Sequence, residues 1–369
     1  MGQTTCKYIC NKDTQNLTLN HGYHSNQNRV IPIPAFHPTT SEINRYNSNL
    51  TQIIRIQANF RGHYERKKNK NEIKKIKACK DANSQKKIRQ IDLVPDYSNA
   101  NTKKAEQMIG PFIYDQPDTP NSKELIDKGP YELDNNAIYI GQWDSKDFRH
   151  GKGIQLWVDG SKYEGYWKND KANGKGRLIH ADGDIYEGEW VNDKAEGLGK
   201  YIHFDGAIYY GEWKSDKQHG KGEERWPDNS NYIGNYENGK KHGKAKFIWS
   251  DGSFYEGEFN YNEITGNGKY CWSDGRSYEG EWKNNKMHGK GIFTWPDGRK
   301  YNGEYIEDEK EGKGEFIWPD GRKFIGYWKN GKQNGKGTYI NVNKVSKEGE
   351  WMDGKRIKWE NDDKTEQTK

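Results

Sequence analysis

The sequence predicts a mainly β protein in which β-hairpins stack in series into one long, twisted antiparallel sheet. The first observation is a phrase, D-G-x-x-Y-x-G-x-W, that recurs every 23 residues after a first step of 24. A fixed period of this length indicates one small supersecondary unit that is repeated and stacked. The second observation is composition: 31% of the residues are hydrophobic and 13% are aromatic, so the sheet is expected to bury rings rather than aliphatic side chains. The anchor aromatics are Tyr139, Tyr163, Tyr186, Tyr209, Tyr232, Tyr255, Tyr278, Tyr301 and Phe324.

Each copy of the phrase is expected to form a hairpin. In one copy, the β-forming run 292–295 is followed by a Pro-Asp-Gly turn signal at 296–298, because Pro fixes φ and Gly accepts a positive φ. The next strand alternates, with Tyr301 and Tyr305 on one face and Gly303 between them. We expect that glycine to let rings of the adjacent hairpin approach closely. One hairpin is marginal in water, but about nine in series sum their stability along neighbours.

Composition and charge both change near residue 130. All fourteen Trp lie at or after Trp143. Residues 1–130 carry 21 Lys and Arg against 12 Asp and Glu, a net charge of +9, whereas the remainder carries −3. Only one of the four cysteines, Cys271, falls in the repeats, so no disulfide framework follows the period. With neither a signal-peptide apolar region nor an apolar run of about 18 residues, the sequence predicts a cytoplasmic protein.

The phrase is similar to the membrane occupation and recognition nexus (MORN) repeat family, most clearly in YEGEWKNNKMHGKGIFTWPDG at residues 278–298. The resemblance covers residues 137–354, as nine full copies and a fraying tenth. It implies an elongated, single-layer sheet with an aromatic-lined groove. Such sheets mostly act as scaffolds that hold partner peptides, and some are linked to membranes or acidic phospholipids. The repeat positions of structural importance, as they stand in three copies, are Tyr163, Gly165, Trp167, Tyr186, Gly188, Trp190, Tyr278, Gly280 and Trp282.

Two interpretations compete for every ring. We expect the Tyr and Trp of the phrase to pack between hairpins rather than to contact a partner. For a third aromatic, near the hairpin tip, packing and exposure in a partner-binding row are evenly balanced, because its face depends on the turn length. These candidate groove residues are Trp226, Trp249, Trp272, Trp295 and Trp318.

Around the expected sheet at residues 131–354, the sequence predicts four further segments. Residues 1–40 are polar and irregular, and residues 81–130 form an irregular linker that contains Pro. Residues 41–80 form a basic amphipathic α-helix, because they lack Pro and their apolar residues are spaced three and four apart. Residues 355–369 form a polar tail.

Inside the predicted helix, residues 56–66 match the full IQ motif, I-Q-x-x-x-R-G-x-x-x-R. The resemblance implies a helical target for calmodulin or a related EF-hand light chain. The residue types agree with it, because an apolar strip suits a Met-rich groove and the arginines can meet acidic surfaces. The alternative is an amphipathic helix that docks on this protein's own sheet. The motif residues are Ile56, Gln57, Phe60, Arg61, Gly62, Tyr64 and Arg66.

The first residues of the chain are a candidate site of acylation. Gly2 follows a removable Met, as myristoylation requires, although Cys6 stands where Ser or Thr is preferred. Cys6 and Cys10 are candidate sites for palmitate, which would supply the second signal that stable anchoring needs. The alternative is an unmodified start. Residues 61–80, with nine Lys and Arg against two Glu, would add a contact with acidic phospholipids worth about 1 kcal/mol per basic residue.

The sequence contains no catalytic constellation. Each G-K-G lysine is followed by Gly rather than Ser or Thr, which excludes a P-loop, and the histidines of the repeat lie at least 23 residues apart. We therefore expect no enzymatic activity, no cofactor and no metal site, and no nucleic-acid motif is present. The sequence supports a scaffold that binds a cytoskeletal or ciliary protein through its sheet and an EF-hand protein through its IQ helix. The alternative is a membrane-apposed module that is tethered by acylation and the basic helix, under EF-hand control.

Overall fold

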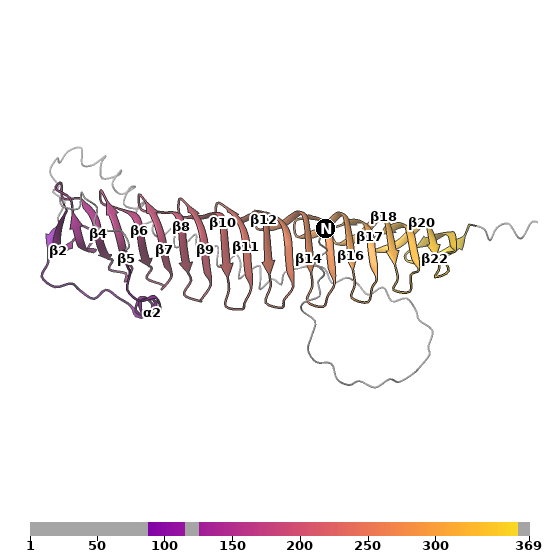
Figure 1. Cartoon of the computed structure of the whole chain (residues 1–369), viewed down its shortest axis with the longest axis horizontal. Helices are drawn as coiled ribbons and strands as arrows, with labels where there is room; N and C mark the ends of the chain where they lie inside the picture. The colour runs from indigo at the N-terminus through magenta and orange to yellow at the C-terminus, as the bar shows by residue number, and fades with distance from the viewer. Residues whose placement is uncertain (1–87, 115–124, 361–369) are drawn as a thin grey trace, which may run out of the picture. The chain divides into compact units, whose positions relative to one another are not determined.

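The computed structural model describes residues 88–114 and 125–360 of the chain. The described residues confirm the predicted class: they form one open antiparallel sheet of 22 strands in hairpin stacks, with a single helix (Figure 1). Residues 1–40, the predicted helix at 41–80 and its IQ motif lie outside the described residues.

The strands are short: β1 has 2 residues, β22 has 5, and the others have 6 to 9. Their bounds, with that of the helix, are β1 (Arg89–Gln90), α2 (Ala100–Ile109), β2 (Ile126–Glu132), β3 (Ile138–Trp143), β4 (Arg149–Leu156), β5 (Lys162–Lys168), β6 (Lys171–Ile179), β7 (Ile185–Val191), β8 (Lys194–Ile202), β9 (Ile208–Lys214), β10 (Lys217–Arg225), β11 (Asn231–Glu237), β12 (Lys240–Ile248), β13 (Phe254–Asn260), β14 (Glu263–Cys271), β15 (Ser277–Lys283), β16 (Lys286–Thr294), β17 (Lys300–Ile306), β18 (Glu309–Ile317), β19 (Lys323–Lys329), β20 (Lys332–Ile340), β21 (Ser346–Met352) and β22 (Lys355–Trp359).

Each strand pairs with the next along the chain, from β1 to β22. Two kinds of turn alternate. Between β15 and β16 the turn has two residues, Asn284 and Asn285, both with positive φ, as a type I′ hairpin requires. Between β16 and β17 the backbone N–H of Gly298, which has a φ of +91°, donates to the Trp295 carbonyl. Every 23-residue repeat therefore contributes one strand pair and one turn of each kind.

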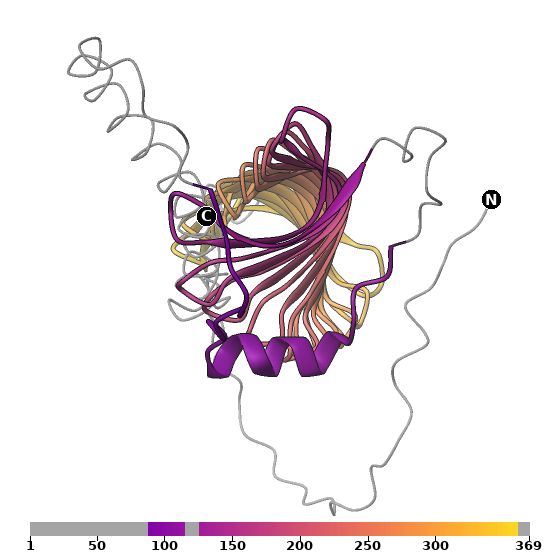
Figure 2. The ribbon, with the colours of Figure 1, turned by 90° about the vertical axis from the view of Figure 1, so that its left-hand side faces the viewer.

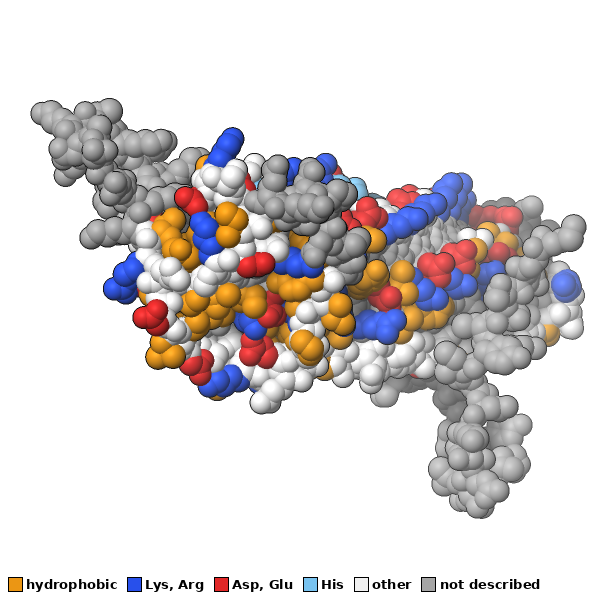
Figure 3. Space-filling view, turned by 60° about the vertical axis from the view of Figure 1, so that its left-hand side comes forward, with side chains coloured by type: hydrophobic (Ala, Val, Ile, Leu, Met, Phe, Trp, Pro, Cys, Tyr) orange, Lys and Arg blue, Asp and Glu red, His pale blue; other side chains and the backbone are white. Residues whose placement is uncertain are grey.

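The strand alternation gives the sheet two unlike faces. One face, here called the aromatic face, carries in one repeat Tyr278, Gly280, Trp282, Gly291 and Phe293. The other, the charged face, carries the residues between them, such as the exposed Glu279, Glu281 and Lys290. Rows of Lys and Arg and of Asp and Glu side chains run along the sheet in the space-filling view (Figure 3).

The rings of the aromatic face are the core of this single-layer sheet. Tyr278 is fully buried, although the described residues form one sheet and provide no second sheet to cover it. Its ring meets Trp282 of its own repeat at 5.0 Å and Tyr305 of the next at 5.2 Å, both edge to face. Its hydroxyl donates to the Glu281 carbonyl at 2.9 Å, and Trp282 Nε1 donates to the Gly268 carbonyl at 3.1 Å. The rings therefore pack along the sheet from repeat to repeat. The Tyr278 hydroxyl and the Trp282 indole N–H both donate hydrogen bonds to backbone carbonyls.

The same arrangement holds in the other copies that carry the predicted structural residues. Tyr163 and Tyr186 are buried, and each packs edge to face against the Trp of its own repeat, Trp167 and Trp190, at 5.1 Å. Gly165 and Gly188 lie beneath these tyrosine rings, as Gly280 lies beneath Tyr278.

Helix α2 lies in the segment 81–130, which the sequence reading treated as an irregular linker; β1 and most of β2 lie there as well. The Asn99 side chain caps the helix by accepting hydrogen bonds from the backbone N–H groups of Asn101 and Thr102, and Gly110 ends it. The prolines of the segment favour irregular backbone, but the stretch between Pro95 and Pro111 contains no Pro and can therefore form a helix.

Helix α2 packs on the charged face of β6, β7 and β8, on one side of the sheet seen end-on (Figure 2). The Arg177 guanidinium donates to the Gly110 carbonyl at 2.8 Å, and Lys162 Nζ lies 2.9 Å from Glu106 Oε1. The apolar contact is a cluster of Ala105, Ile109, Ile179, Ile185 and Ile202.

At the other end, the polar tail predicted from residue 355 begins with a strand. Strand β22 pairs with β21, for example Trp359 with Gly349, and Trp359 packs on Trp351 at 5.9 Å. The short strand closes the last hairpin, as a terminal repeat that caps the array would. Residues 361–369 lie outside the described residues.

Candidate functional site on the aromatic face

A continuous row of rings runs along the aromatic face over its C-terminal half. The members alternate between a buried ring on a strand and a Trp at the start of the following turn. Consecutive ring centroids are 4.4 to 6.3 Å apart, so each ring contacts the next. We call this row the aromatic ladder; it consists of Trp226, Phe247, Trp249, Tyr270, Trp272, Phe293, Trp295, Phe316, Trp318 and Tyr339.

All five candidate groove tryptophans belong to the ladder, and all five are half-buried. The sequence left open whether these tryptophans pack within the sheet or are exposed, and each does both. One side of the indole packs on another ring, and another part stays accessible. In one repeat, Trp295 packs on Phe293 at 4.4 Å and on Phe316 at 5.7 Å. Their role in binding a partner remains a proposal.

Arginine side chains border the exposed sides of three of these tryptophans. The Arg299 guanidinium lies 5.3 Å from the Trp295 ring centroid and is held by Asp297, with Nε 2.7 Å from Oδ2. Arg276 repeats the arrangement on Trp272, and Arg322 on Trp318. A guanidinium on an indole face contributes about 0.5–1 kcal/mol at an exposed site. In these three repeats the ladder thus offers apolar ring surface next to charged hydrogen-bonding groups.

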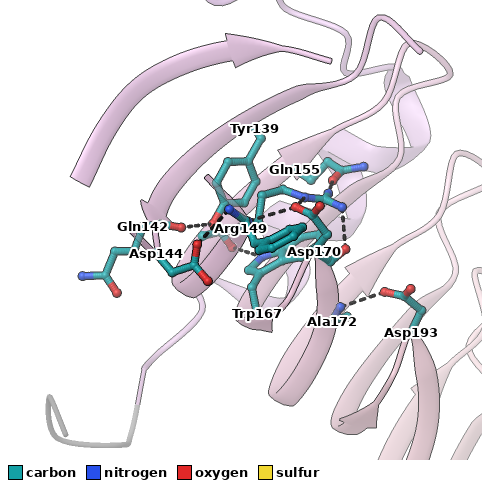
Figure 4. A network of polar contacts seen from close by, with 11 residues as sticks. Tyr139, Gln142, Asp144, Arg149, Gln155, Trp167, Asp170, Ala172 and Asp193 are labelled. Carbon is teal, nitrogen blue, oxygen red and sulfur yellow. Dashed lines mark hydrogen bonds and ion pairs between the residues drawn. The ribbon is translucent and has the colours of Figure 1, made fainter. Parts of the chain in front are cut away.

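A polar network occupies the aromatic face at the first repeats (Figure 4). The Arg149 guanidinium lies over the ring of Trp167, 4.3 Å from its centroid. It donates to Gln155 Oε1, to the Asp170 carboxylate at 3.2 Å and to the Asp170 carbonyl. Trp167 Nε1 donates to the Gly153 carbonyl at 3.1 Å. The cation is therefore fully supplied with acceptors from within the sheet.

A buried ion pair lies further along the same face. Lys241 Nζ lies 2.8 Å from Glu224 Oε2, and the Tyr236 hydroxyl donates to the same oxygen at 2.9 Å. Burial raises the pKa of the Glu224 carboxyl to about 7, against the hydrogen bond from Tyr236 and the charge of His203. Burial also lowers the pKa of Lys241. Such a pair is costly to break, because one partner alone would leave a buried, unpaired charge.

A second buried cluster precedes the ladder, where His203 stands in the position that the ladder fills with Trp. Asp184 accepts hydrogen bonds from the Tyr201 hydroxyl at 2.7 Å and the Phe204 backbone N–H at 2.8 Å, and its Oδ2 lies 3.3 Å from His203 Nδ1. Burial acts to raise the pKa of Asp184, but the hydrogen bond and charge of His203 and the other donors lower it. Burial acts to lower the pKa of His203, whose hydrogen bond and attraction to Asp184 raise it.

These clusters were not predicted from the sequence. The signal that could have found them is a charged or polar residue at a repeat position that is apolar in other copies. Lys241 and Lys310 stand where other copies have Ala, Ile or Met, and Glu224 stands where the next copies have Phe247 and Tyr270.

The remaining predicted sites lie elsewhere or outside the described residues. The IQ residues 56–66 and the candidate acylation sites Gly2, Cys6 and Cys10 are outside them. Within residues 88–114 and 125–360, no group of three or more His, Cys, Asp and Glu side chains is arranged to hold a metal ion. In the same residues, no helix combines the length and the apolar character that crossing a membrane requires.

Comparison with solved structures found weak likenesses. The TCP10 domain of Danio rerio CPAP matches with a TM-score of 0.30 and 10% identity, covering 56% of this chain and 94% of that one. The CPAP G-box domain matches with a TM-score of 0.29 and 14% identity, covering 55% and 100%. The Drosophila melanogaster SAS-4 TCP domain, in complex with a proline-rich motif of Ana2, matches with a TM-score of 0.26 and 12% identity, covering 52% and 95%. A search of curated protein sequences found no match.

The comparison with family models gave a match over most of the sheet. The MORN repeat model matches nine consecutive stretches, at residues 139–162, 163–185, 186–208, 209–231, 232–254, 255–275, 278–298, 301–321 and 324–344. Together they cover more than half of the chain, in register with the hairpins and with the buried tyrosines that begin them. The chain therefore belongs to the MORN-repeat family.

Proposed function

We propose that the protein is a non-enzymatic interaction scaffold of the cytoplasm whose aromatic ladder binds a protein partner of the cytoskeleton or cilium. The repeat family supports a scaffold, because its units build a surface rather than a catalytic cleft. The buried Tyr and Trp supply that surface with a rigid base, since in the repeat of Tyr278 and Trp282 their polar atoms donate to backbone carbonyls.

The observation that carries the proposal is the half-buried state of the five ladder tryptophans. Half-buried indoles, held by rings beneath and bordered by arginines, combine apolar area with rigidity, which is typical of residues that dominate binding energy. Two strands advance the sheet by about 9.5 Å, so a Trp recurs at about the length of three residues of extended chain. A peptide in the polyproline II conformation, which has three residues per turn, would thus place every third side chain against one indole.

The test compares two faces of the same sheet. The native full-length protein and two variants are used to capture partners, which are quantified by mass spectrometry. The Trp272→Leu/Trp295→Leu variant removes indoles from the ladder, and Ile233→Ser/Ile325→Ser removes exposed apolar groups from the charged face. We expect the first to lose a partner at least about tenfold, as two half-buried anchors of about 1 kcal/mol or more would require, and the second to retain it. Equal capture by all three proteins contradicts the proposal.

We further propose that the IQ residues 56–66 bind calmodulin or a related EF-hand light chain, which the sequence pattern alone supports. Capture by immobilised calmodulin, with calcium and with a chelator, tests this. The wild type should be retained in one of the two conditions, and Ile56→Asp or Arg61→Glu should abolish retention. Retention of neither wild type nor variants ends this part of the proposal and leaves the ladder proposal intact.

The alternative function is a membrane-apposed module. Acyl chains on Gly2 and on Cys6 or Cys10, with the basic segment 61–80, would hold the sheet at acidic phospholipids, and an EF-hand protein that covers the basic segment would release it. Intact-mass measurement of the native N-terminus decides between the two: an unmodified Gly2 with free Cys6 and Cys10 removes this alternative.

A further inference from the structure

Within the nine full repeats, one position holds a cation in three copies. Arg149, Lys241 and Lys310 are separated by whole multiples of 23 residues and all project onto the aromatic face. The other six full copies hold uncharged residues at this position, namely Ala172, Ala195, Gln218, Ile264, Met287 and Gln333, and the terminal strand β22 holds the exposed Arg356. The three cations therefore occupy equivalent sites, and their surroundings can be compared directly.

Two of the cations have acceptors within the sheet. Lys241 is paired with Glu224, whose Oε2 also accepts the Tyr236 hydroxyl, and Arg149 is bonded to Gln155 and Asp170. In both cases the acceptors are side chains on the neighbouring strands or turns.

At Lys310 each of those positions has lost its acceptor. The residue equivalent to Glu224 is Phe293, the residue equivalent to Gln155 is Phe316, and the residue equivalent to Asp170 is Gly331. Lys310 Nζ instead lies among four rings, 5.2 to 5.6 Å from the centroids of Trp295, Tyr301, Phe316 and Trp328.

The hydroxyl opposite Lys310 has lost the same partner. Tyr305 pairs directly with Lys310 across β17 and β18, as Tyr236 pairs with Lys241. Within the described residues, the buried Tyr305 hydroxyl has no hydrogen-bond partner, whereas Tyr236 donates to Glu224. Lys310 keeps 8% of its surface exposed. Two donors that share one carboxylate in the earlier copy are thus both without one here.

The charge on Lys310 makes this arrangement one that attracts an anion. Burial and the nearby Arg299 lower the pKa of Lys310 to about 8, so the side chain is still mostly protonated at pH 7. Aromatic rings compensate a buried ammonium group only in part, whereas a hydrogen-bonded carboxylate supplies both an opposite charge and a hydrogen-bond acceptor. A carboxylate that reached Lys310 would restore the group that Glu224 provides at Lys241.

We propose that Lys310 binds a carboxylate from an acidic side chain of the partner peptide. This inference rests on the proposed function, because the site adjoins the ladder at Trp295, where the peptide would lie. In the described part of the chain, the elements packed most closely on β18 are its neighbours in the sheet, β17 and β19. A carboxylate is favoured over phosphate because the equivalent site encloses the carboxylate of Glu224.

The experiment uses full-length protein and a defined probe, an acetylated and amidated peptide of six Glu, with six Gln as the neutral peptide. Binding is measured by calorimetry at pH 7. We expect the acidic peptide to bind at least about tenfold more tightly than the neutral one, since a hydrogen-bonded charge contact contributes roughly 1.5–3 kcal/mol. Equal binding of the two peptides overturns the inference, as does inorganic phosphate that occupies the site while acetate does not.

Three variants place the binding at Lys310. Lys310→Met carries the residue that Met287 has at the same position one repeat earlier, so the fold can accommodate it. Phe293→Glu supplies an internal carboxylate where Glu224 stands in the earlier copy. Both should lose the preference for the acidic peptide at least about tenfold, whereas Lys290→Met, which removes an exposed charge from the charged face, should change it less than about twofold.

A fourth variant creates the site anew. Glu224→Phe leaves Lys241 and Tyr236 as Lys310 and Tyr305 are, so the number of acidic peptides bound should rise from one to two, with folding checked by circular dichroism. Unchanged stoichiometry in this variant together with wild-type binding by Lys310→Met overturns the inference. If Trp272→Leu/Trp295→Leu still loses its partner in that case, the ladder proposal stands and only the carboxylate site fails.

Discussion

Tyr278 lies over Gly291 of the neighbouring strand so closely that a Cβ atom at residue 291 would be 2.3 Å from the Tyr278 hydroxyl oxygen. The paired Gly280 is equally restricted, since its Cβ would lie 2.5 Å from the Gly291 Cα atom. The two glycines thus form a flat surface, here called the floor, on which the Tyr278 ring lies. Tyr278 belongs to the same strand as Gly280 and precedes it by two residues. The sequence predicts that rings of the adjacent hairpin lie close to the glycine. That prediction is wrong, because the close ring belongs to a tyrosine of the same hairpin.

The first prediction concerns this floor. Gly291→Ala should lower the free energy of unfolding by about 1–3 kcal/mol, because the new methyl group forces a buried ring to move. Urea denaturation measures it. Gly129→Ala is the matched control: this exposed strand glycine has only the flexible Gln90 side chain nearby, at 3.5 Å, and its replacement should change stability by less than about 0.5 kcal/mol. Equal effects at the two positions would contradict the role given to the floor.

The second prediction concerns the hydroxyl of the anchor tyrosine. Tyr278→Phe removes the hydrogen bond to the Glu281 carbonyl and should cost about 1 kcal/mol, while the ring packing stays. Phe324 already occupies the anchor position in a later copy, so Phe324→Tyr should raise stability by a similar amount. Thermal and urea unfolding of both variants test this prediction. If both substitutions lower the stability, the hydrogen bond of the hydroxyl is not the cause.

The third prediction concerns the buried ion pair. Lys241→Met and Glu224→Phe should each lower stability by about 3–5 kcal/mol, because each leaves one charge buried and unpaired. The double variant should recover most of the loss, since Met287 and Phe293 occupy the same two positions in a later copy. A double-mutant cycle by urea denaturation measures the coupling, and additive losses would show that the two residues act independently.

The fourth prediction is a pH dependence. Burial, with the charge of Arg299, lowers the pKa of Lys310 from its ordinary value of 10.5 to about 8 in the folded protein. Between these values the unfolded chain binds more protons, so stability rises with pH. Lys310→Met should therefore be more stable than the wild type by about 3 kcal/mol at pH 7, and the difference should shrink as pH rises from 8 to 10.5. Unfolding of both proteins in parallel cancels the tyrosine titrations. If the difference in unfolding free energy between the two proteins does not vary with pH, the burial of the charged Lys310 does not destabilise the folded protein.

The period alone sufficed to predict the hairpins, their order and the burial of the anchor rings, because each of these follows from strand alternation and turn residues. Contacts between copies were harder to predict. The Lys241–Glu224 pair joins residues 17 positions apart, which meet only because the register of β10, β11 and β12 places them on one face. The only local sequence signal for this contact is a charged residue at a repeat position that is apolar in other copies.

Helix α2 shows a different limit of the sequence reading. Its cap at Asn99 and its stop at Gly110 are written in the sequence, but its docking surface of Ile179, Ile185 and Ile202 comes from three different strands. An expectation based on local proline content therefore missed an element whose stability depends on the folded sheet.

The measurement that tests the central claim most directly is photo-crosslinking in the cells that make the protein. A benzophenone amino acid replaces Trp272 in one sample and the exposed Ile233 of the charged face in another, and crosslinked proteins are identified by mass spectrometry. We predict a specific crosslink to a cytoskeletal or ciliary protein from position 272 and none to that protein from position 233. A partner that crosslinks from position 233 and not from position 272 would contradict the assignment of the aromatic ladder as the binding surface.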